Sequence, residues 1–515
     1  MKRRIAAFCS LLLAASMLLP CAAAEADRFA ISDPYENIDW QTVAQYKTAL
    51  HTHTNASDGT PTLKESLQRH IAAGFDIVAV TDHGTVDRGW ANGPETNLIK
   101  GVLSIAGRSE GELEYLGAGG TFSDGEAYTY ETDISGNSFL RTGSGRRVLR
   151  LPNGIEQNAV SVNAHVTSWF ADFRWNGISG YEEGLCGVEK NGGLCVINHP
   201  GEYSKARYEI RSENAYDEKD LSFAYHINKF ASYLDRYDAC IGIDMNSKGD
   251  NRTRFDRILW DKLLTRFSKK GETVYGIASS DAHQLSVVDT GFSVLLLPEL
   301  TAEAAKTALK NGEFFAASHC LGNPDELAEI AGALKTICGA DNATAKKAAA
   351  AAQNMARRVA DIESGKLKAD EDIDMTYSVL DSDGVPTVKT FPRVTRISVD
   401  DSENTITVQS ENALVVRFIS GGKTLASVAA DAAVLDLDDW TDLPADYVRA
   451  EVFGEGGIVY TQAFLLNAEE NAAKNSGMKV TRGCFLDLGT FDFVIAEVHK
   501  WLRIAKLWLA VRTGV

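Results

Sequence analysis

The sequence predicts an α/β fold with parallel strands between about residues 46 and 320. Helical stretches alternate there with short, continuous apolar runs of the kind that buried parallel strands show. Residues 62–73 carry leucines and an isoleucine at helical spacing and end at Gly74, and the apolar run 76–80 follows directly. Further apolar runs predict additional buried strands at residues 193–197, 239–243 and 274–278.

The first 24 residues have the pattern of a secretory signal peptide. Basic residues 2–4 precede the apolar run 5–19, and three alanines at 22–24 supply a cleavage site near Ala24. We therefore expect a secreted or extracytoplasmic protein. Removing the signal changes the formal charge from −18 to −21, because three positive charges and no negative ones are lost. So acidic a chain is not expected to bind long nucleic acids, which require neutralisation of many phosphates.

The composition changes after about residue 320. Period-two alternation of apolar and polar residues predicts strands between residues 393 and 466, and the alanine-rich stretch before them predicts helices. An amphipathic helix is predicted at 491–512, with a basic polar face and tryptophans. This helix either docks on the β-rich domain or makes a peripheral membrane or cell-surface contact. The expected organisation is a signal peptide (1–24), a main α/β domain (46–320), an Ala-rich helical segment (321–385), a small β-sandwich-like domain (386–467) and a C-terminal tail (468–515).

Cysteine spacing gives no clear framework. Two pairs, Cys186 with Cys195 and Cys320 with Cys338, are close enough in sequence to form disulfides in an oxidising compartment. The absence of any disulfide fits the composition slightly better. No zinc-ribbon spacing is present.

Histidines and carboxylates follow the predicted strands in short local patterns. Two histidines at i and i+2 on an extended segment project to the same side and can reach one ion. Each pattern alone is a weak signal, but together they predict a metal or catalytic cluster at the strand C-termini. Asp82 is expected to orient an imidazole from outside the cluster. The patterns are His51-Thr52-His53 with Ser57-Asp58-Gly59, Thr81-Asp82-His83-Gly84, Gly154-Ile155-Glu156 with His165, Asn198-His199-Pro200-Gly201 and Asp281-Ala282-His283.

In this order, the motifs resemble those of the polymerase and histidinol phosphatase (PHP) family. The resemblance covers about residues 46–320, and residues 310–318 are similar to the segment that closes such domains. It implies a distorted (β/α)7 TIM-like barrel with a trinuclear metal site. The long insertion between Thr85 and Pro152 departs from the pattern near the expected substrate pocket.

Position by position, the resemblance implies three metal-binding sets. Mixed imidazole and carboxylate donors suit three divalent ions of Zn, Mn or Fe. Glu156, Asp281 and His283 are the residues expected to take part in catalysis. The implied ligands are His51, His53, Glu156 and Asp281 for the first ion, Glu156, His165 and His199 for the second, and Asp58, His83 and His283 for the third.

The resulting interpretation is an exported hydrolase of small phosphate esters, in which a hydroxide bridging two ions attacks phosphorus. A phosphodiesterase or short-oligonucleotide nuclease and an amidohydrolase remain open on the same site. A cell-surface binding protein with a structural metal site is a further alternative. Arg88, Arg146 and Arg147 are candidate phosphate contacts.

Overall fold

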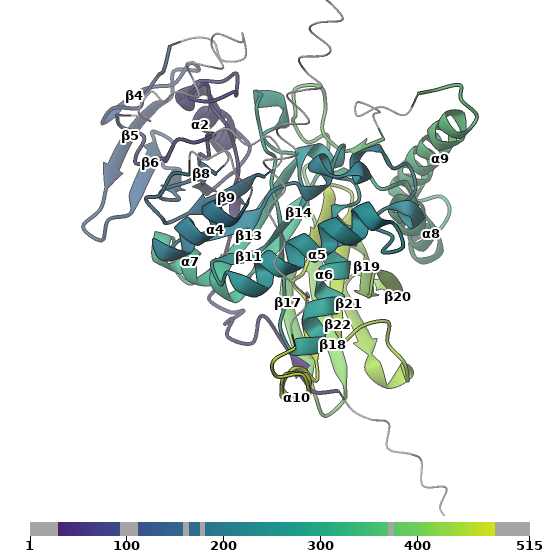
Figure 1. Ribbon diagram of the computed structural model, residues 1–515. Coiled ribbons are helices and arrows are strands. Elements are labelled where there is room, and N and C mark those ends of the chain that lie inside the picture. Colours follow the sequence, from purple (N-terminus) through teal and green to yellow (C-terminus); the bar gives the residue numbers. More distant parts are fainter. Residues whose placement is uncertain (1–28, 93–111, 158–163, 176–180, 369–374, 479–515) are drawn as a thin grey trace, which may run out of the picture.

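The computed structural model describes residues 29–92, 112–157, 164–175, 181–368 and 375–478 (Figure 1). The predicted signal peptide and the predicted helix at 491–512 lie outside the described residues, so export and membrane contact stay predictions. Within the described ranges, no helix has both the length and the apolar character needed to cross a membrane.

The first predicted helix is confirmed as α2 (Leu63–Ala72). Thr62 and Glu65 form a reciprocal capping box, which satisfies free backbone N–H groups of the first turn. Leu63, Leu67 and Ile71 are buried on one face, as the spacing predicted. The chain then enters the short buried strand β3 (Ile77–Val78).

Two sheets build the region that carries the predicted site. One contains β2 (Ala44–Ala49), β3, β13 (Gly291–Leu297) and β14 (Phe314–Ser318). The other has the order β12-β11-β10-β9-β8. Its strands are β8 (Ile155–Glu156), β9 (Val166–Trp169), β10 (Leu194–Ile197), β11 (Cys240–Asn246) and β12 (Tyr275–Ala278).

The expectation of parallel strands is met in part. The pairs β2–β3, β10–β11 and β11–β12 are parallel, whereas β8–β9 and β9–β10 are antiparallel. The two sheets are linked by single parallel bridges, Thr52 to Ala282 and His83 to Glu156. Over the described residues, continuous strand pairing does not close the regular barrel that the resemblance implied. The junctions are single bridges because the chain there turns into the loops that carry the predicted ligands.

Helices cover the outer faces of these sheets (Figure 1). Helix α4 packs on β9 and β10, helices α5 and α6 pack on β11, and α7 packs on β13. This arrangement leaves the loops at the strand C-termini to form the site. The helices are α4 (Tyr181–Lys190), α5 (Leu221–Arg236), α6 (Asp256–Phe267) and α7 (Ala302–Asn311).

The insertion after residue 85 contains an antiparallel extension of the first sheet. β7 pairs in parallel with β3, and the strands then run outward in the order β7-β6-β5-β4. The extension projects from one side of the molecule (blue in Figure 1). Its strands are β4 (Gly119–Thr121), β5 (Ala127–Thr132), β6 (Ser138–Thr142) and β7 (Arg147–Arg150).

The C-terminal half contains the predicted helices α8 (Pro324–Cys338) and α9 (Ala343–Glu363), followed by strands. β23 pairs with β14 through Ala316 and Tyr460, so the later strands continue the first sheet. A separate sheet has the order β17-β18-β21 and shares a hydrophobic core with it. The predicted domain boundaries stay predictions. The remaining elements are β17 (Arg393–Asp400), β18 (Thr405–Glu411), β19 (Ala413–Ser420), β20 (Lys423–Ala429), β21 (Ala432–Asp436), β22 (Tyr447–Gly454), β23 (Gly457–Tyr460), β24 (Phe464–Leu466), α10 (Ala468–Lys474), β1 (Ile31–Ser32), β15 (Cys320–Leu321) and β16 (Tyr377–Ser378).

The cysteines of the described ranges are all free thiols. Cys186 and Cys195 are not bonded to each other, and neither are Cys320 and Cys338.

Candidate metal centre

The structure brings all nine predicted ligands into one network of nitrogen–oxygen contacts. Each lies at or beside a strand end, which is where α/β folds place their sites. His51 and His53 follow β2, and Asp58 lies on the loop after them. The others are His83 after β3, Glu156 at the end of β8, His165 just before β9, His199 after β10, and Asp281 and His283 after β12.

Glu156 lies at the middle of this network. Its Oε1 is 2.7 Å from His165 Nδ1 and 3.4 Å from His199 Nε2. Its Oε2 is 2.8 Å from His83 Nδ1 and 3.3 Å from His53 Nε2. One buried carboxylate thus faces imidazoles on several sides, an arrangement suited to a ligand shared between two ions.

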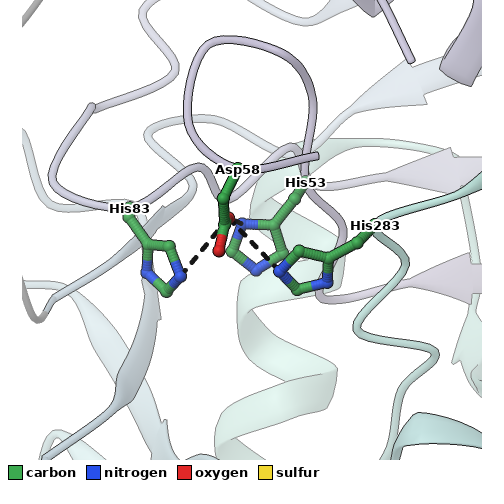
Figure 2. Close-up of side chains that lie close together, drawn as sticks. All are labelled: His53, Asp58, His83 and His283. Atoms are coloured by element: carbon green, nitrogen blue, oxygen red, sulfur yellow. Dashed lines mark ion pairs between the residues drawn. The ribbon is translucent and has the colours of Figure 1, made fainter. Parts of the chain in front are cut away.

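Asp58 gathers the imidazoles on the more open side of the site (Figure 2). Its Oδ1 is 3.2 Å from His283 Nε2, 3.5 Å from His83 Nε2 and 3.6 Å from His53 Nδ1. The exposed fractions are 23% for the Asp58 side chain, 14% for His83 and 31% for His283. This part of the centre is therefore the one that solvent reaches.

Asp281 faces the buried side. Its Oδ1 is 3.1 Å from His51 Nε2 and 3.0 Å from His53 Nε2, and its Oδ2 is 3.5 Å from His199 Nε2. Asp281 and His199 both have positive φ, 46° and 24°. Such backbone is costly for residues other than glycine and is concentrated at functional sites.

The ligand atoms converge, and several of them are left without a hydrogen bond of good geometry. His53 Nε2, Asp58 Oδ1, Glu156 Oε2 and both Asp281 oxygens are buried and make no hydrogen bond of good geometry within the described structure. Buried polar atoms are almost always satisfied, so a set of orphaned donors facing a common centre fits bound cations. Four overlapping groups have donor atoms close enough to hold an ion: His53, Asp58, His83 and His283; His51, His53 and Glu156; His51, His199 and Asp281; and His83, Glu156 and His165.

Electrostatics agree with this fit. Burial lowers the pKa of His51 to about 4, which leaves a neutral imidazole able to bind a metal ion. Burial also opposes charge on His53, but its contacts with Asp281 and Glu156 outweigh burial and raise its pKa to about 9. Although burial raises the pKa of Glu156 and Asp281, nearby cationic groups hold both well below their ordinary values. The carboxylates are thus ionised, and divalent ions can replace protons as their counter-charge.

Further polar groups orient the imidazoles. Thr81 Oγ1 is 2.7 Å from His51 Nδ1, and Ser57 Oγ is 3.2 Å from His53 Nδ1. Ser57 in turn donates to Asp82 at 2.6 Å. The predicted orienting role of Asp82 thus reaches His53 through Ser57.

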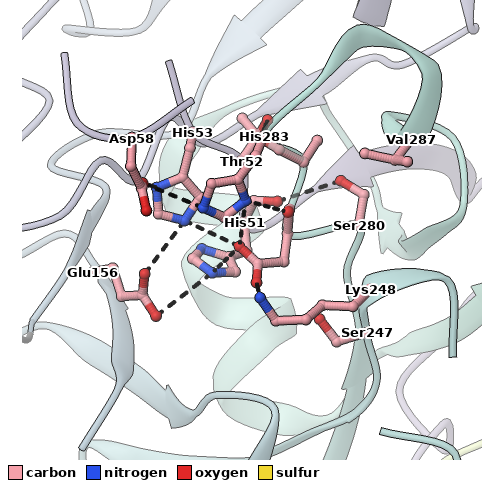
Figure 3. A network of polar contacts seen from close by, with 12 residues as sticks. His51, Thr52, His53, Asp58, Glu156, Ser247, Lys248, Ser280, His283 and Val287 are labelled. Atoms are coloured by element: carbon pink, nitrogen blue, oxygen red, sulfur yellow. Dashed lines mark hydrogen bonds and ion pairs between the residues drawn. The ribbon is translucent and has the colours of Figure 1, made fainter. Parts of the chain in front are cut away.

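The sequence reasoning missed two charged residues of the site. Glu202 Oε2 lies 3.4 Å from His199 Nδ1, within ion-pair distance although neither atom makes a hydrogen bond. Lys248 points into the network from the loop after β11 and contacts Asp281 (Figure 3). The spacing of Glu202, three residues after His199, was an available signal. For Lys248 the signal was its place just after a predicted strand.

The arginines considered as phosphate contacts make other interactions. Arg88 pairs with Asp172 at the surface, and Arg146 donates to the carbonyls of Ile71 and Phe75. Arg147 stacks on the ring of Phe139. None of these contacts involves the nine predicted ligands.

No protein-family model and no curated protein matches the sequence. Among solved structures, a two-domain protein from Bacteroides vulgatus, described as containing a predicted PHP-like metal-dependent phosphoesterase, aligns over 86% of this chain and 100% of its own. Its identity is 14% and its TM-score 0.35. The lesion-specific endonuclease EndoQ from Pyrococcus furiosus aligns over 52% of this chain and 56% of its own, with 10% identity and a TM-score of 0.27. At these TM-scores, inference about function rests on the site itself.

Proposed function

We propose that this protein is a metal-dependent hydrolase that releases phosphate from small phosphate esters. The observation that carries the proposal is the convergence of nine histidine and carboxylate side chains, several of whose buried nitrogen and oxygen atoms make no hydrogen bond. The order of the motifs, which resembles the PHP family, supports phosphate esters as the substrate class. The signal pattern at residues 1–24 supports action outside the cytoplasm.

Three ions are proposed, with the three ligand sets that the resemblance to the PHP family implies. A bound divalent ion lowers the pKa of a coordinated water and withdraws electron density from a phosphoryl oxygen. Glu156 would be shared between two of the ions, and Thr81 and Ser57 hold the imidazole rings of His51 and His53 in orientation. In the overall reaction, water adds to phosphorus, the P–O bond to the alcohol breaks, and the alcohol leaves with a proton.

The open side of the centre suits entry of a substrate. Asp58, His83 and His283 are partly exposed, whereas Glu156 and Asp281 are buried. We propose that the phosphoryl group approaches from this side and that His283, the most exposed of the three, contacts it. A closed structural site would bury all its ligands, so this asymmetry favours catalysis.

The test is phosphate release by metal-reconstituted protein from a panel of monoesters and diesters, the diesters with a coupling phosphatase. Glu156→Gln keeps the shape of the side chain but removes its charge. Its activity is expected to fall by more than the ~10- to 100-fold typical of losing an outer partner of a ligand. Glu189→Gln, at an exposed position on α4, is the matched control and should retain full activity.

The outcomes separate the alternatives. Turnover of monoesters that depends on Glu156 supports the proposal, and turnover confined to diesters supports a phosphodiesterase. Tight metal binding without turnover of any ester would overturn the proposal in favour of an amidohydrolase or a structural site. Equal activity of Glu156→Gln and wild type would remove Glu156 from the mechanism.

A further inference from the structure

The loop after β11 has an unusual backbone beside the metal centre. A register shift between Asp244 and Asn246 bends the strand as it ends. Lys248, Gly249 and Asp250 then have consecutive positive φ angles of 51°, 62° and 60°. Left-handed backbone at two residues with side chains persists only where the surroundings hold it in place.

Asp250 anchors one side of this loop away from the centre. Its carboxylate accepts two hydrogen bonds from Arg257, both 2.9 Å, and another from the backbone N–H of Gly322. The hydroxyl of Thr253 donates to the carbonyl of Ser247 at 2.7 Å. These contacts impose the left-handed path and leave little freedom for the residue at 248.

Lys248 extends in the other direction, into the centre (Figure 3). Its ammonium contacts Asp281 Oδ2 and lies 3.2 Å from Glu202 Oε2. Both carboxylates already have other cationic or imidazole neighbours: Asp281 faces His51, and Glu202 accepts from Arg252 at 3.1 Å. Pairing these acids does not by itself require a lysine on a strained loop.

We propose that Lys248 binds a phosphoryl oxygen of the substrate. Asp281 joins Lys248 to the open side of the centre, because its Oδ2 contacts Lys248 and its Oδ1 lies 3.6 Å from His283 Nδ1. The inference rests on the proposed function and deepens it. The Lys248 side chain is 23% exposed, against 1% for the Asp281 side chain that it contacts. An ammonium offers three donors and a full charge to a phosphate oxygen. An ion bound at Asp281 would neutralise part of the carboxylate charge and leave the Lys248 ammonium available to the substrate.

The experiment measures three quantities on metal-reconstituted protein: bound metal by elemental analysis, affinity for inorganic phosphate by calorimetry, and kcat and KM with p-nitrophenyl phosphate. Lys248→Met is expected to weaken phosphate binding and lower kcat/KM about 10- to 100-fold, as for loss of a charged hydrogen bond. Its metal content should equal that of wild type. Lys248→Arg should recover part of the affinity.

Matched variants separate a substrate contact from structural support. Glu202→Gln is expected to weaken metal binding, because it removes the carboxylate charge that lies within ion-pair distance of His199. Lys205→Met, at an exposed lysine paired with Asp220, should change nothing. Lys248→Gly removes the side chain while relaxing the left-handed backbone, so its loss of phosphate affinity cannot be ascribed to misfolding.

Unchanged phosphate affinity in both Lys248→Met and Lys248→Gly would overturn the inference. Loss of bound metal in parallel with phosphate affinity would also overturn it, since Lys248 would then support Asp281. If wild type hydrolyses no ester, the proposed function fails, but the phosphate titration still decides the role of Lys248.

Discussion

Two buried charged clusters of this molecule are built on opposite principles. The first is the metal centre. The second, here called the arginine network, consists of Arg257, Arg417, Arg449, Asp250, Asp261, Glu326 and Glu451. In the network, guanidinium groups meet carboxylates in forked pairs: Arg449 donates twice to Asp261, both at 2.8 Å.

The difference between the two clusters shows which buried charges stabilise the fold. The arginine network joins α6, α8, β19 and β22, and its carboxylates are paired with arginines. At the metal centre, imidazoles and carboxylates face a common point, and several of their atoms make no hydrogen bond. Buried charges therefore have two different meanings: carboxylates paired with arginines hold elements together, whereas buried imidazole and carboxylate atoms without a hydrogen bond need a ligand.

The largest effect is expected from Arg449→Met. Removing one partner leaves Asp261 and Glu451 as buried charges with fewer partners, which costs about 3–5 kcal/mol of unfolding free energy. Urea unfolding of metal-free protein measures it. A loss below 1 kcal/mol would show that the network is dispensable and would remove the contrast drawn here.

A third kind of buried group sharpens the comparison. His70 is fully buried on α2, and burial lowers its pKa to about 4 from 6.5. Between these pH values the unfolded chain binds the proton and the folded protein does not. Stability is therefore lost as the pH falls through this window, by about 3 kcal/mol in total.

The measurement is the unfolding free energy of wild type and His70→Leu from pH 7 to pH 4. The pH dependence assigned to His70 should be absent from the variant. As the pH falls, the unfolding free energy of wild type should therefore decrease relative to that of His70→Leu. A constant difference across the range would show that His70 does not titrate in this way.

Metal addition should separate the two clusters. Binding to the folded state alone stabilises it by about 2.7 kcal/mol at a hundredfold excess of ion over its Kd. Arg449→Met should keep this increment, because Arg449 contacts none of the nine predicted ligands. Asp281→Asn should lose most of it. Thermal unfolding with and without Zn²⁺ or Mn²⁺ measures the increment, and an equal increment in Asp281→Asn would contradict the assignment.

The smallest effect is expected at the surface. Arg211 makes a forked contact with Glu363, but both side chains are 40% exposed or more. Arg211→Met should lower the unfolding free energy far less than Arg449→Met does in the same urea experiment, because solvent screens an exposed ion pair. A cost equal to that of Arg449→Met would mean that pairing geometry, not burial, decides the contribution.

The nine ligands were predicted from local patterns, and the structure places these residues close together. His51 and His53, or Asp281 and His283, share a side because of spacing alone, and the apolar run before each pair places it at a strand end. Lys248 belongs to no such pattern. The role inferred for Lys248 depends on its contacts with Glu202 and Asp281, which lie 46 and 33 positions away in the sequence.

By itself, the sequence determined the helix at 63–72, the buried strands, and the nine residues that meet at the site. Only the tertiary structure decided that β9 runs antiparallel to both β8 and β10 and that β23 pairs with β14. It also decided that Lys248 contacts Asp281 in the centre. A strand buried on both faces has the same apolar pattern whichever way its neighbour runs. Direction and long-range pairing follow from how whole elements pack, which local spacing does not record.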